Sequence, residues 1–342
     1  MRHVVFHLLN DYSGSPKVLR GVVEHMLADG DDVRLYTSRG GTLDALDAPR
    51  LRHSAIPYTF SPRKAATLLR YVWAQLLSFG CALSYALSKD TDFYINTILP
   101  VGAALGARLA GKRVTLHCHE NPAAKSRAYL ALAGVMLRLA DRVVCVSKFQ
   151  ADRLADLFPR LKNIEIVPNS LSRDFLSALR PDPETAFERR NVLMLTSLKA
   201  YKGMREFLNL ASMLPQYRFT LVVNDTVANI RAWLRSNGIT PAANVTIHPR
   251  QREVAKFYNE ASLVMNLSNP RLFVETFGMT ALEARAARLP VIAPPTGGIA
   301  ELITDGTDGY LIDCHDTPRL IQAVETLLSD RELYLRLAAG AT

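Results

Sequence analysis

Two glutamates, Glu275 and Glu283, are the residues whose types and spacing best suit chemistry. Phe277-Gly278-Met279 between them predicts a turn, and a helix is expected over residues 280–287. A glycine turn entering a helix presents unpaired N–H groups at the positive end of the helix dipole, which suits a phosphate. A carboxylate on either side of the turn can accept hydrogen bonds from sugar hydroxyls. The alternative is a capped amphipathic helix with two solvated glutamates, the ordinary state of surface glutamate.

The residues that follow this pair extend the pattern. They read Leu-Pro-Val-Ile-Ala at 289–293, Thr-Gly-Gly-Ile-Ala-Glu-Leu-Ile at 296–303, and Asp-Gly-Thr-Asp-Gly-Tyr-Leu-Ile at 305–312. Together with residues 275–283 they resemble the donor-binding half of retaining glycosyltransferases of the group 1, family-four class, which have the GT-B fold. The resemblance covers most of the chain and is sharpest over about 190–315. It implies a nucleotide-sugar, UDP- or GDP-linked, as co-substrate, with no tightly bound cofactor and no metal.

Breaking a sugar–phosphate bond leaves negative charge on the diphosphate, which a transferase must stabilise with positive groups already in place. The segment 196–203 follows an expected strand, and the family carries an arginine and then a lysine before glycine there. By this resemblance Lys202 matches the lysine, while Ser197 stands where the arginine is usual. Lys199 is expected to supply the missing charge. The alternative for both lysines is solvation at the surface.

The resemblance also assigns roles around the two glutamates. It implies that Glu275 faces the transferred sugar, that Glu283 binds the ribose hydroxyls, and that the backbone of Phe277, Gly278 and Met279 meets the phosphates. Glycine at 278 permits close approach of the backbone. The base is expected near residues 248–252, including Arg250.

In the first half of the chain, Leu116-His-Cys-His-Glu-Asn121 ends an expected strand. His117 and His119 share one face by the two-residue strand period, which raises metal binding as an alternative. No third and fourth ligands are evident in the sequence, and the family commonly has a histidine near the sugar at this strand end. His119 is the better match and is predicted to be catalytic with Glu275 and Lys202. An ordinary core histidine is the remaining alternative.

Gly14 and Ser15 occupy the first strand–helix turn, where the family has a glycine-rich loop near the donor phosphate and the acceptor. The sequence has no Gly-x-Gly-x-x-Gly motif, which argues against a nicotinamide dehydrogenase. It also has no Gly-x-Ser-x-Gly elbow, which argues against a hydrolase of that type.

Alternating strands and helices must position these residues, and they predict an α/β fold with parallel, doubly wound sheets. Strands are expected at 4–9, 32–37, 93–96, 114–117 and 142–146, and, after a polar stretch at 180–185, at 192–196, 219–223, 244–247, 263–267 and 291–293. We therefore expect an acceptor-side Rossmann-like domain over 1–170, a linker over 171–190 and a donor-binding Rossmann-like domain over 191–342, facing across a cleft. The helix that returns to the first domain in related chains is expected to be missing.

Charge and hydropathy suggest the partners. The 342 residues carry a formal net charge of +9, and residues 61–142 hold 11 Lys or Arg against 4 Asp or Glu. No nucleic-acid motif accompanies this charge, so an anionic membrane surface or a phosphate-bearing acceptor is preferred. The segment 65–87 is mainly apolar with the single charge Arg70, and a buried helix is favoured over one at a membrane interface. Four cysteines without a Cys-x2-Cys pair indicate a reducing compartment.

The sequence thus predicts a cytoplasmic, metal-independent retaining hexosyltransferase, with peripheral attachment to the inner face of the plasma membrane as an alternative location. Its substrates are expected to be a nucleotide-sugar donor and a glycan or lipid-linked acceptor. Ser197 and the expected absence of the return helix leave a second hypothesis, a non-catalytic sugar-nucleotide-binding or scaffold protein. A GT-B epimerase or phosphorylase is a further alternative, although no cofactor-lysine motif of a phosphorylase is evident.

Overall fold

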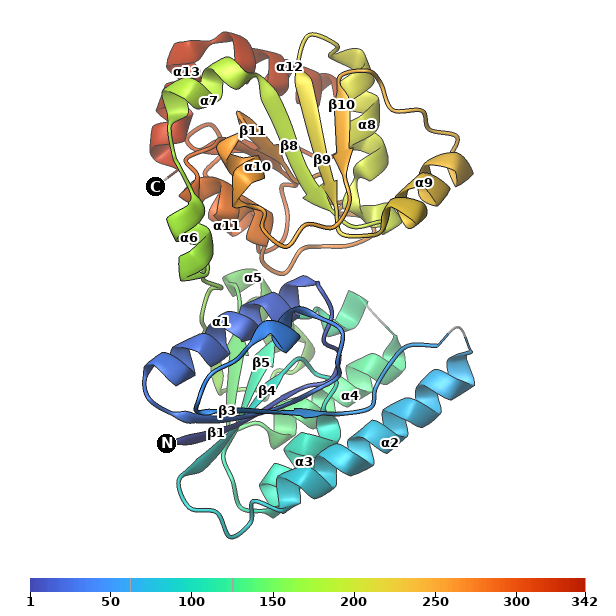
Figure 1. Cartoon of the computed structure of the whole chain (residues 1–342), viewed down its shortest axis with the longest axis vertical. Coiled ribbons are helices and arrows are strands. Elements are labelled where there is room, and N and C mark those ends of the chain that lie inside the picture. The colour runs from blue at the N-terminus through green and yellow to red at the C-terminus, as the bar shows by residue number, and fades with distance from the viewer. Residues whose placement is uncertain (62, 125, 342) are drawn as a thin grey trace. The chain divides into compact units, whose positions relative to one another are not determined.

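The computed structural model describes residues 1–61, 63–124 and 126–341; Thr342, the last residue of the expected second domain, lies outside them. The chain forms two compact units, Met1–Ser170 and Leu171–Thr342 (Figure 1). The range 171–190, expected as a linker, contains α6 (Arg173–Ala178) and α7 (Pro183–Arg189). Leu179, Ala186 and Phe187 of this range are buried in the core of the second unit. The stretch looks polar in the sequence because only a few of its side chains face that core.

The first unit is a seven-stranded parallel sheet in the order β3-β2-β1-β4-β5-β6-β7. The strands are β1 (Arg2–His7), β2 (Asp32–Thr37), β3 (Leu51–Ala55), β4 (Thr91–Asn96), β5 (Val114–Cys118), β6 (Arg142–Cys145) and β7 (Ile164–Ile166). The helices are α1 (Gly14–Ala28), α2 (Lys64–Leu83), α3 (Val101–Leu109), α4 (Arg127–Leu139) and α5 (Lys148–Leu157), with short 3-10 helices η1 (Thr42–Ala45) and η2 (Pro122–Ala124).

Side chains of alternate residues on β1 pack into different cores, as the strand period requires. Val5 lies with Leu19 and Val23 of α1, whereas Val4 and Phe6 lie in the core formed with α2, α3 and α4. Helices therefore cover both faces of the sheet, which is the doubly wound arrangement that parallel sheets need to bury their strands.

The second unit is a six-stranded parallel sheet in the order β10-β9-β8-β11-β12-β13. Its strands are β8 (Asn191–Thr196), β9 (Arg218–Val223), β10 (Val245–His248), β11 (Leu263–Met265), β12 (Val291–Ala293) and β13 (Gly309–Leu311). Its further helices are η3 (Ala200–Lys202), α8 (Met204–Met213), α9 (Val227–Ser236), α10 (Ala255–Asn259), α11 (Met279–Ala286), η4 (Ala300–Leu302), α12 (Thr317–Ser329) and α13 (Arg331–Gly340). Separate apolar cores line its two faces.

Every strand expected from the sequence is present, with ends that differ by no more than two residues, and the predicted fold class is confirmed. The expected set lacked β3, β7 and β13, which are three of the four edge strands; the fourth, β10, was expected. β3 and β7 contain no fully buried residue. An edge strand needs no continuous apolar run, so its sequence carries a weak signal.

The expectation that residues 65–87 form a buried helix is wrong. Helix α2 exposes its large apolar side chains, and only Ala74, Ser78 and Ala82 among its residues are buried. It is the one helix of the described residues that is long and apolar enough to cross a membrane, by length and composition alone. Hydropathy does not reveal which side of such a helix packs, and here the packed side carries the small residues.

Candidate functional site

Most of the predicted residues of the second unit follow the carboxyl ends of three neighbouring strands. β8 leads into the Lys202 segment, β11 into the loop with Glu275, and β12 into the glycine turn at 296–298. β11 pairs with β8 on one side and with β12 on the other. Parallel strands end at one edge of the sheet, where ligands of doubly wound folds bind. Residues far apart in sequence therefore meet there.

Two glycines hold these loops close together. Gly203 has a φ of +74°, and a Cβ on it would lie 2.1 Å from the backbone oxygen of Leu267. Gly297 has a φ of +93°, and a Cβ on it would lie 2.4 Å from the backbone oxygen of Glu275. Glycine adopts left-handed backbone conformations at the lowest cost, and it has no Cβ to clash. Both positions therefore need glycine for conformation and for space.

Lys202 and Glu275 meet at the centre of this edge. The Lys202 ammonium donates a hydrogen bond to Oε1 of Glu275 and forms an ion pair with it. The Ser268 hydroxyl donates to the same oxygen at 2.8 Å. The two charged side chains keep only 24% and 14% of their area exposed, so solvent screens the pair less than it would at the surface. The structure thus pairs Glu275, which the resemblance assigns to the transferred sugar, with Lys202, which it assigns to the leaving diphosphate.

A stacked aromatic pair borders the lysine. The rings of Tyr201 and Phe273 lie 4.6 Å apart with an interplanar angle of 20°. Nζ of Lys202 lies 5.0 Å from the centroid of Phe273 and 5.8 Å from that of Tyr201. A cation beside aromatic faces is attracted by their quadrupoles. The ammonium is therefore held by the rings as well as by Glu275.

Glu283 is buried, with 8% of its area exposed. The hydroxyl of Tyr258 donates a hydrogen bond to Oε2 of Glu283. Burial raises the pKa of Tyr258 well above its ordinary value, and the neighbouring carboxylate raises the pKa further. The tyrosine therefore stays protonated and remains a donor. A solvated glutamate, the alternative that the sequence left open, does not describe Glu283.

The helix expected after the glycine turn is α11, which begins at Met279. Gly278 precedes it with a φ of +113°, and a Cβ there would lie 2.4 Å from Cγ1 of Ile299. Phe277 is buried, while Met279 is partly exposed. The first amides of such a helix have no partner within the helix. The geometry therefore fits the expected phosphate-facing turn, whose role remains a prediction.

Lys199 and Arg250, the other two basic residues predicted to bind the donor, are exposed. Lys199 is exposed, with Nζ 5.9 Å from the ring centroid of Tyr201. Arg250 is exposed after β10, and its Nε donates to Oδ1 of Asn224 at 2.9 Å. The structure places Lys199 on the same short loop as Ser197.

In the first unit, His119 belongs to a chain of polar side chains at the carboxyl ends of β1, β4 and β5. Nε2 of His119 lies 2.8 Å from Oδ1 of Asn96, and Nδ2 of Asn96 lies 3.0 Å from Nδ1 of His7. Asn96 also donates to the backbone oxygen of Ser15 at 3.3 Å. Burial holds the pKa of His119 well below its ordinary value, and the nearby His117 and His7 lower it further. His119 is therefore neutral near pH 7.

His117 lies beside His119, with ring centroids 4.1 Å apart. Its Nδ1 is 2.6 Å from the hydroxyl of Tyr94, and burial lowers its pKa to about 4, with Arg142 adding to the effect. Tyr129 fixes the following loop by donating to Oε1 of Glu120 at 3.0 Å. The burial of His117 matches the core-histidine alternative, whereas His119 keeps part of its surface accessible.

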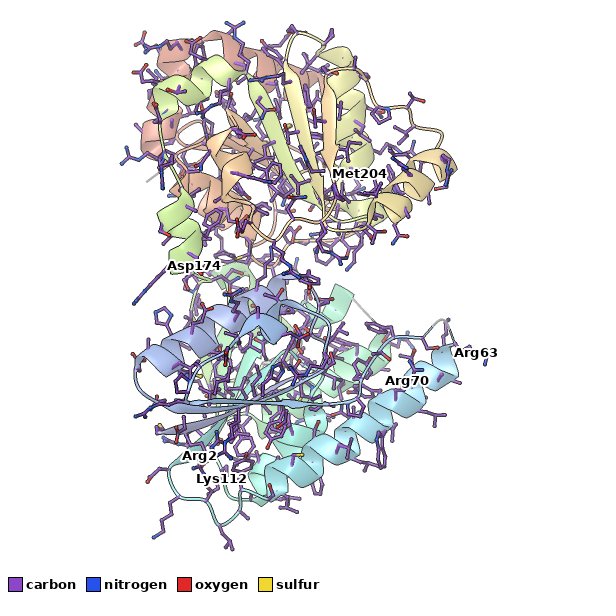
Figure 2. The ribbon with its side chains drawn as sticks, in the orientation of Figure 1. Arg2, Arg63, Arg70, Lys112, Asp174 and Met204 are labelled. Carbon is purple, nitrogen blue, oxygen red and sulfur yellow. The ribbon has the colours of Figure 1, made fainter. Side chains whose placement is uncertain are left out.

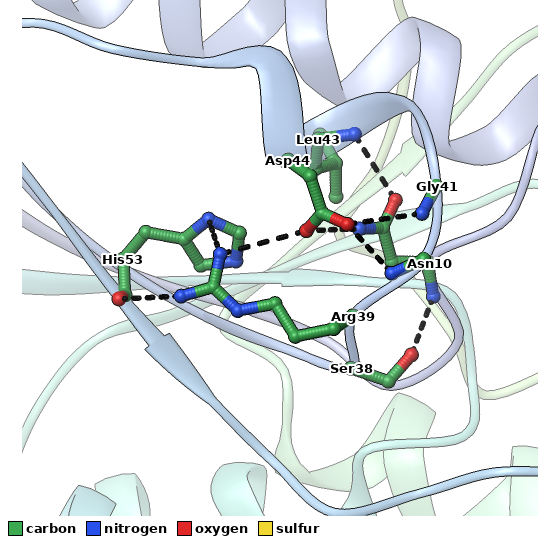
Figure 3. A network of polar contacts seen from close by, with 8 residues as sticks. Asn10, Ser38, Arg39, Gly41, Leu43, Asp44 and His53 are labelled. Carbon is green, nitrogen blue, oxygen red and sulfur yellow. Dashed lines mark hydrogen bonds and ion pairs between the residues drawn. The ribbon is translucent and has the colours of Figure 1, made fainter.

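Gly14 and Ser15 were expected in the turn before the first helix, but the structure places them in the first turn of α1 itself. The preceding loop is fixed by a polar network around Asn10 and Asp44 (Figure 3). Asn10 donates to Oδ1 of Asp44 at 3.0 Å and to the hydroxyl of Ser38, through its backbone N–H, at 2.9 Å. This network positions the loop that leads from β1 to the start of α1.

One group of potential metal ligands exists in the described residues, and it consists of Asp313, Cys314 and His315. Nδ1 of His315 lies 2.7 Å from Oδ1 of Asp313, and burial raises the pKa of the Cys314 thiol to about 12. This group includes none of the residues predicted to carry the chemistry.

Two family models match the chain, one in each unit. The model described as "Glycosyl transferase 4-like domain" matches residues 13–170, and "Glycosyl transferases group 1" matches residues 178–342. The chain belongs to the group 1 glycosyltransferases. The resemblance seen in the sequence is thereby confirmed for the family.

Curated relatives of this glycosyltransferase match only part of its length. The D-inositol 3-phosphate glycosyltransferase of Xylanimonas cellulosilytica is 26% identical over 222 residues, which are 59% of this chain and 52% of the relative. The D-inositol 3-phosphate glycosyltransferase 1 of Catenulispora acidiphila is 36% identical over 94 residues, which are 28% of this chain and 21% of the relative. The chain spans about half the length of the first of these relatives.

Solved structures match along the whole chain. HepE of Anabaena, in complex with UDP and glucose, gives a TM-score of 0.79 at 17% identity and covers 100% of this chain and 93% of its own. Sucrose-phosphate synthase of Thermosynechococcus elongatus gives 0.79 at 18% identity, covering 99% and 92%. WaaG, a glycosyltransferase involved in lipopolysaccharide biosynthesis, gives 0.72 at 16% identity, covering 100% and 94%. At these identities the likeness establishes the fold, which is GT-B.

Residues of the site that were missed in the sequence include Ser268, Tyr258 and Asn96, as well as Tyr201, Phe273 and His7. Ser268 follows β11 and lies seven residues before Glu275, so its place at a strand end was a usable signal. Tyr258 reaches Glu283 from α10, 25 residues away, and Asn96 reaches His119 across 23 residues. Such side-chain contacts depend on packing, and neither tyrosine nor asparagine carries a local pattern that reveals them.

Proposed function

We propose that this chain is a retaining glycosyltransferase that moves a hexose from a nucleotide sugar to a hydroxyl group of a glycan or lipid-linked acceptor. The donor is a UDP- or GDP-sugar, and the reaction needs no bound metal and no tightly held cofactor. One observation carries the proposal. Lys202 and Glu275, which lie 73 residues apart, are paired at the ligand-binding edge of the second sheet, beside the glycine turn that opens α11.

Lys202 is the proposed partner of the leaving diphosphate. A lysine ammonium has three N–H donors, and the pair with Glu275 uses one of them. The other donors can bind phosphate oxygens. The N-terminus of α11 adds a partial positive charge of roughly half an elementary charge. Together they stabilise the negative charge that develops on the diphosphate as the bond breaks.

Glu275 is the proposed partner of the transferred sugar. Lys202 and Ser268 both contact Oε1, and no described residue is seen to donate to Oε2. That oxygen can accept a hydrogen bond from a sugar hydroxyl. Glu283, held by Tyr258, is assigned to the ribose, and the backbone of 277–279 to the phosphates. His119 is assigned to the sugar and Gly14, Ser15, Lys199 and Arg250 to supporting contacts with the donor, following the family pattern.

Retention follows if the acceptor attacks the face from which the diphosphate departs. The bond between the anomeric carbon and the phosphate oxygen breaks as the acceptor oxygen bonds to that carbon, and the acceptor proton passes to the departing phosphate oxygen. The sugar gains oxocarbenium character on the way. Glu275 positions the sugar in this scheme and forms no covalent bond. A double displacement would need a carboxylate on the opposite face of the sugar, and the sequence offers no candidate for it.

For the whole protein we propose a cytoplasmic enzyme, peripherally attached to an anionic membrane and with no nucleic-acid partner. The excess of basic residues over 61–142 supports this proposal, as does the exposed apolar face of α2. The relatives named as D-inositol 3-phosphate glycosyltransferases and the UDP complex of HepE agree with a nucleotide-sugar donor.

Ser197 favours a second candidate, a GT-B protein that binds a sugar nucleotide without turning it over. Serine stands there in place of the usual arginine, so one positive charge is absent from the β8 loop. Such a protein would bind the donor but leave it intact.

The test begins with a thermal-shift screen of UDP- and GDP-sugars. A ligand at one hundred times its Kd stabilises the native state by ~2.7 kcal/mol, which is readily measured. With the donor so found, initial rates and calorimetry are compared for Glu275→Gln, Glu283→Gln and Glu188→Gln, a control on the exposed side of α7. We expect Glu275→Gln to lower mainly turnover, Glu283→Gln mainly affinity, and Glu188→Gln neither.

Three outcomes separate the candidates. Donor binding with turnover that Glu275→Gln abolishes supports the transferase. Donor binding without turnover, for any acceptor class offered, supports the scaffold. Wild-type rates and affinity in both site variants overturn the assignment of the two glutamates.

A further inference from the structure

Helix α2 is turned so that small side chains face the unit and most of its large apolar side chains face outward. Ala74, Ser78 and Ala82, spaced four residues apart, are buried. Leu69 is 71% exposed, Trp73 56% and Leu76 59%. A helix of a soluble domain ordinarily buries its large apolar residues. The arrangement in α2 is the reverse.

The glycines of α3 fix this orientation. A Cβ on Gly102 would lie 2.2 Å from the backbone oxygen of Gln75, and one on Gly106 would lie 2.5 Å from that of Phe79. The side chain of Gln75 accepts from the backbone N–H of Gly102 at 2.8 Å, and Tyr71 donates to the backbone oxygen of Leu99 at 2.9 Å. The two helices approach too closely for leucine or tryptophan to enter the interface. The outward face is thus a consequence of specific packing.

The large exposed residues of α2 lie on one side of the helix, because their spacing follows the helical period. They are Leu68, Leu69, Val72, Trp73, Leu76 and Leu83, and Leu105 and Leu109 of the adjoining α3 are exposed as well. Each of them is at least 39% exposed. α2 and α3 lie side by side in the first unit (Figure 1). Contiguous apolar surface of this kind marks a site of interaction, whereas single exposed leucines do not.

The charges beside this surface have one sign. α2 contains Lys64 and Arg70 and no acidic residue, and Arg63 directly precedes it. All three basic residues are exposed, and Arg63 and Arg70 lie at the N-terminal end of the helix (Figure 2). Arg70 is held there by donating to Oγ1 of Thr59 at 2.8 Å. The surface therefore joins an apolar stripe to three exposed basic residues.

We propose that this surface, which we call the α2 face, docks on an anionic lipid bilayer. The helix lies along the interface with Leu69, Trp73 and Leu76 among the lipids and the basic residues at the headgroups. Apolar insertion combined with basic residues is how interfacial helices bind anionic lipid. The helix does not span the bilayer, because its small-residue side remains packed on α3. The docking itself does not depend on the proposed function. Only its role does, which is to bring the unit to a lipid-linked acceptor.

The experiment uses the full chain with Trp233 replaced by phenylalanine. Trp73 is then the only tryptophan, since the sequence contains two. Vesicles of phosphatidylcholine with phosphatidylglycerol are compared with vesicles of phosphatidylcholine alone, at low and high salt. We expect co-sedimentation and a blue shift of Trp73 emission with the anionic vesicles at low salt. Both signals should weaken at high salt, because headgroup electrostatics are screened.

A matched pair of variants locates the contact. Leu69→Ser with Leu76→Ser should lower the vesicle partition coefficient at least tenfold and leave the circular dichroism spectrum unchanged, since both side chains face outward. Leu176→Ser, at a leucine on α6 that is 48% exposed, should leave partition unchanged. Arg70→Gln should lower partition to anionic vesicles and remove part of its salt dependence.

Several outcomes would overturn the proposal. These are no binding to anionic vesicles at low salt, equal partition of the Leu69/Leu76 variant, or equal binding to neutral and anionic vesicles. A blue shift that rises with protein concentration in the absence of lipid, together with a dimer mass in sedimentation, would instead assign the α2 face to a second copy. Vesicle binding is measured without donor or acceptor, so it can succeed or fail independently of the transferase reaction.

Discussion

Replacing Tyr258 with phenylalanine tests whether this tyrosine positions Glu283 for the ribose of the donor. The substitution removes one hydroxyl, which donates to Oε2 of Glu283, and leaves the ring in place. The exposed fractions are 1% for Tyr258 and 8% for Glu283, so water does not readily replace the lost donor. A hydrogen bond to a charged group contributes about 1.5–3 kcal/mol. We expect the free energy of unfolding to fall by about this amount.

Nucleotide affinity should fall by less. The carboxylate of Glu283, with one contact fewer, must be ordered again on binding, which costs about 0.5–1.5 kcal/mol for one side chain. The Kd of the nucleoside diphosphate should therefore rise about 2- to 12-fold, since 1.4 kcal/mol corresponds to a factor of ten. An analogue without the ribose hydroxyls never uses Glu283 and should lose little affinity in the variant. In Tyr258→Phe, the Kd of the analogue divided by the Kd of the diphosphate should therefore fall by the same factor.

The assay is calorimetry with the diphosphate and its 2′,3′-dideoxy analogue, alongside urea unfolding. Tyr334→Phe is a matched control, because Tyr334 is equally buried in the same unit and its hydroxyl donates to the backbone oxygen of Ser262 at 2.7 Å. The control should lower stability without changing the ratio of Kd values. Tyr258→Phe should add little to Glu283→Gln, as expected for residues acting through one contact. An unchanged ratio in Tyr258→Phe, with lowered stability, would refute the positioning role.

Further predictions concern the lysines, metal and pH. Lys202→Ala should reduce turnover more than Lys199→Ala in initial-rate assays, and Ser197→Arg should partly rescue Lys199→Ala if Lys199 supplies the missing charge; a folded variant without rescue would count against compensation. EDTA should leave turnover largely intact, and complete loss would contradict a metal-free site. His117 has a pKa of about 4 in the folded state against ~6.5 unfolded. The unfolded state therefore takes up its proton first as pH falls, and urea unfolding should show stability decreasing by up to ~1.4 kcal/mol per pH unit from 6.5 toward 4. That dependence should be reduced in His117→Asn and kept in His25→Asn, at an exposed histidine.

The central strands were predictable because their residues are buried on both faces of a parallel sheet. Phe219–Val223 and Val291–Ala293, for example, are apolar runs bounded by polar or turn residues, and both are present in β9 and β12. Three of the four edge strands lacked that signal. β3 has the sequence LRHSA and contains no fully buried residue, so no apolar run marks it.

The orientation of α2 could not be predicted from hydropathy, because alanine and leucine are both apolar. Its burial depends on Gly102 and Gly106 of α3, which let the backbone of Gln75 and Phe79 and the side chain of Ala82 approach closely. The close approach of α2 and α3 depends on the sequences of both helices. The pattern of apolar residues along α2 alone therefore does not predict it.

The site was predictable to the extent that backbone conformation defines it. Gly203, Gly278 and Gly297 all have positive φ and close neighbours, so these positions demand glycine and leave a trace in the sequence. The contacts of Glu283 with Tyr258 and of His119 with Asn96 are made by side chains that many packings would permit. No local pattern distinguishes them, and the structure is needed to find them.

On the proposed function, the pairing of Lys202 with Glu275 has a chemical logic. As the bond between sugar and diphosphate breaks, positive charge grows on the sugar and negative charge grows on the diphosphate. The ion pair offers the opposite sign at each end, with the carboxylate toward the sugar and the ammonium toward the phosphate. Both groups keep less than a quarter of their area exposed, so their field is weakly screened. Ser268 and the rings of Tyr201 and Phe273 hold the pair in place before the charge develops, and such preorganisation is the main source of electrostatic catalysis.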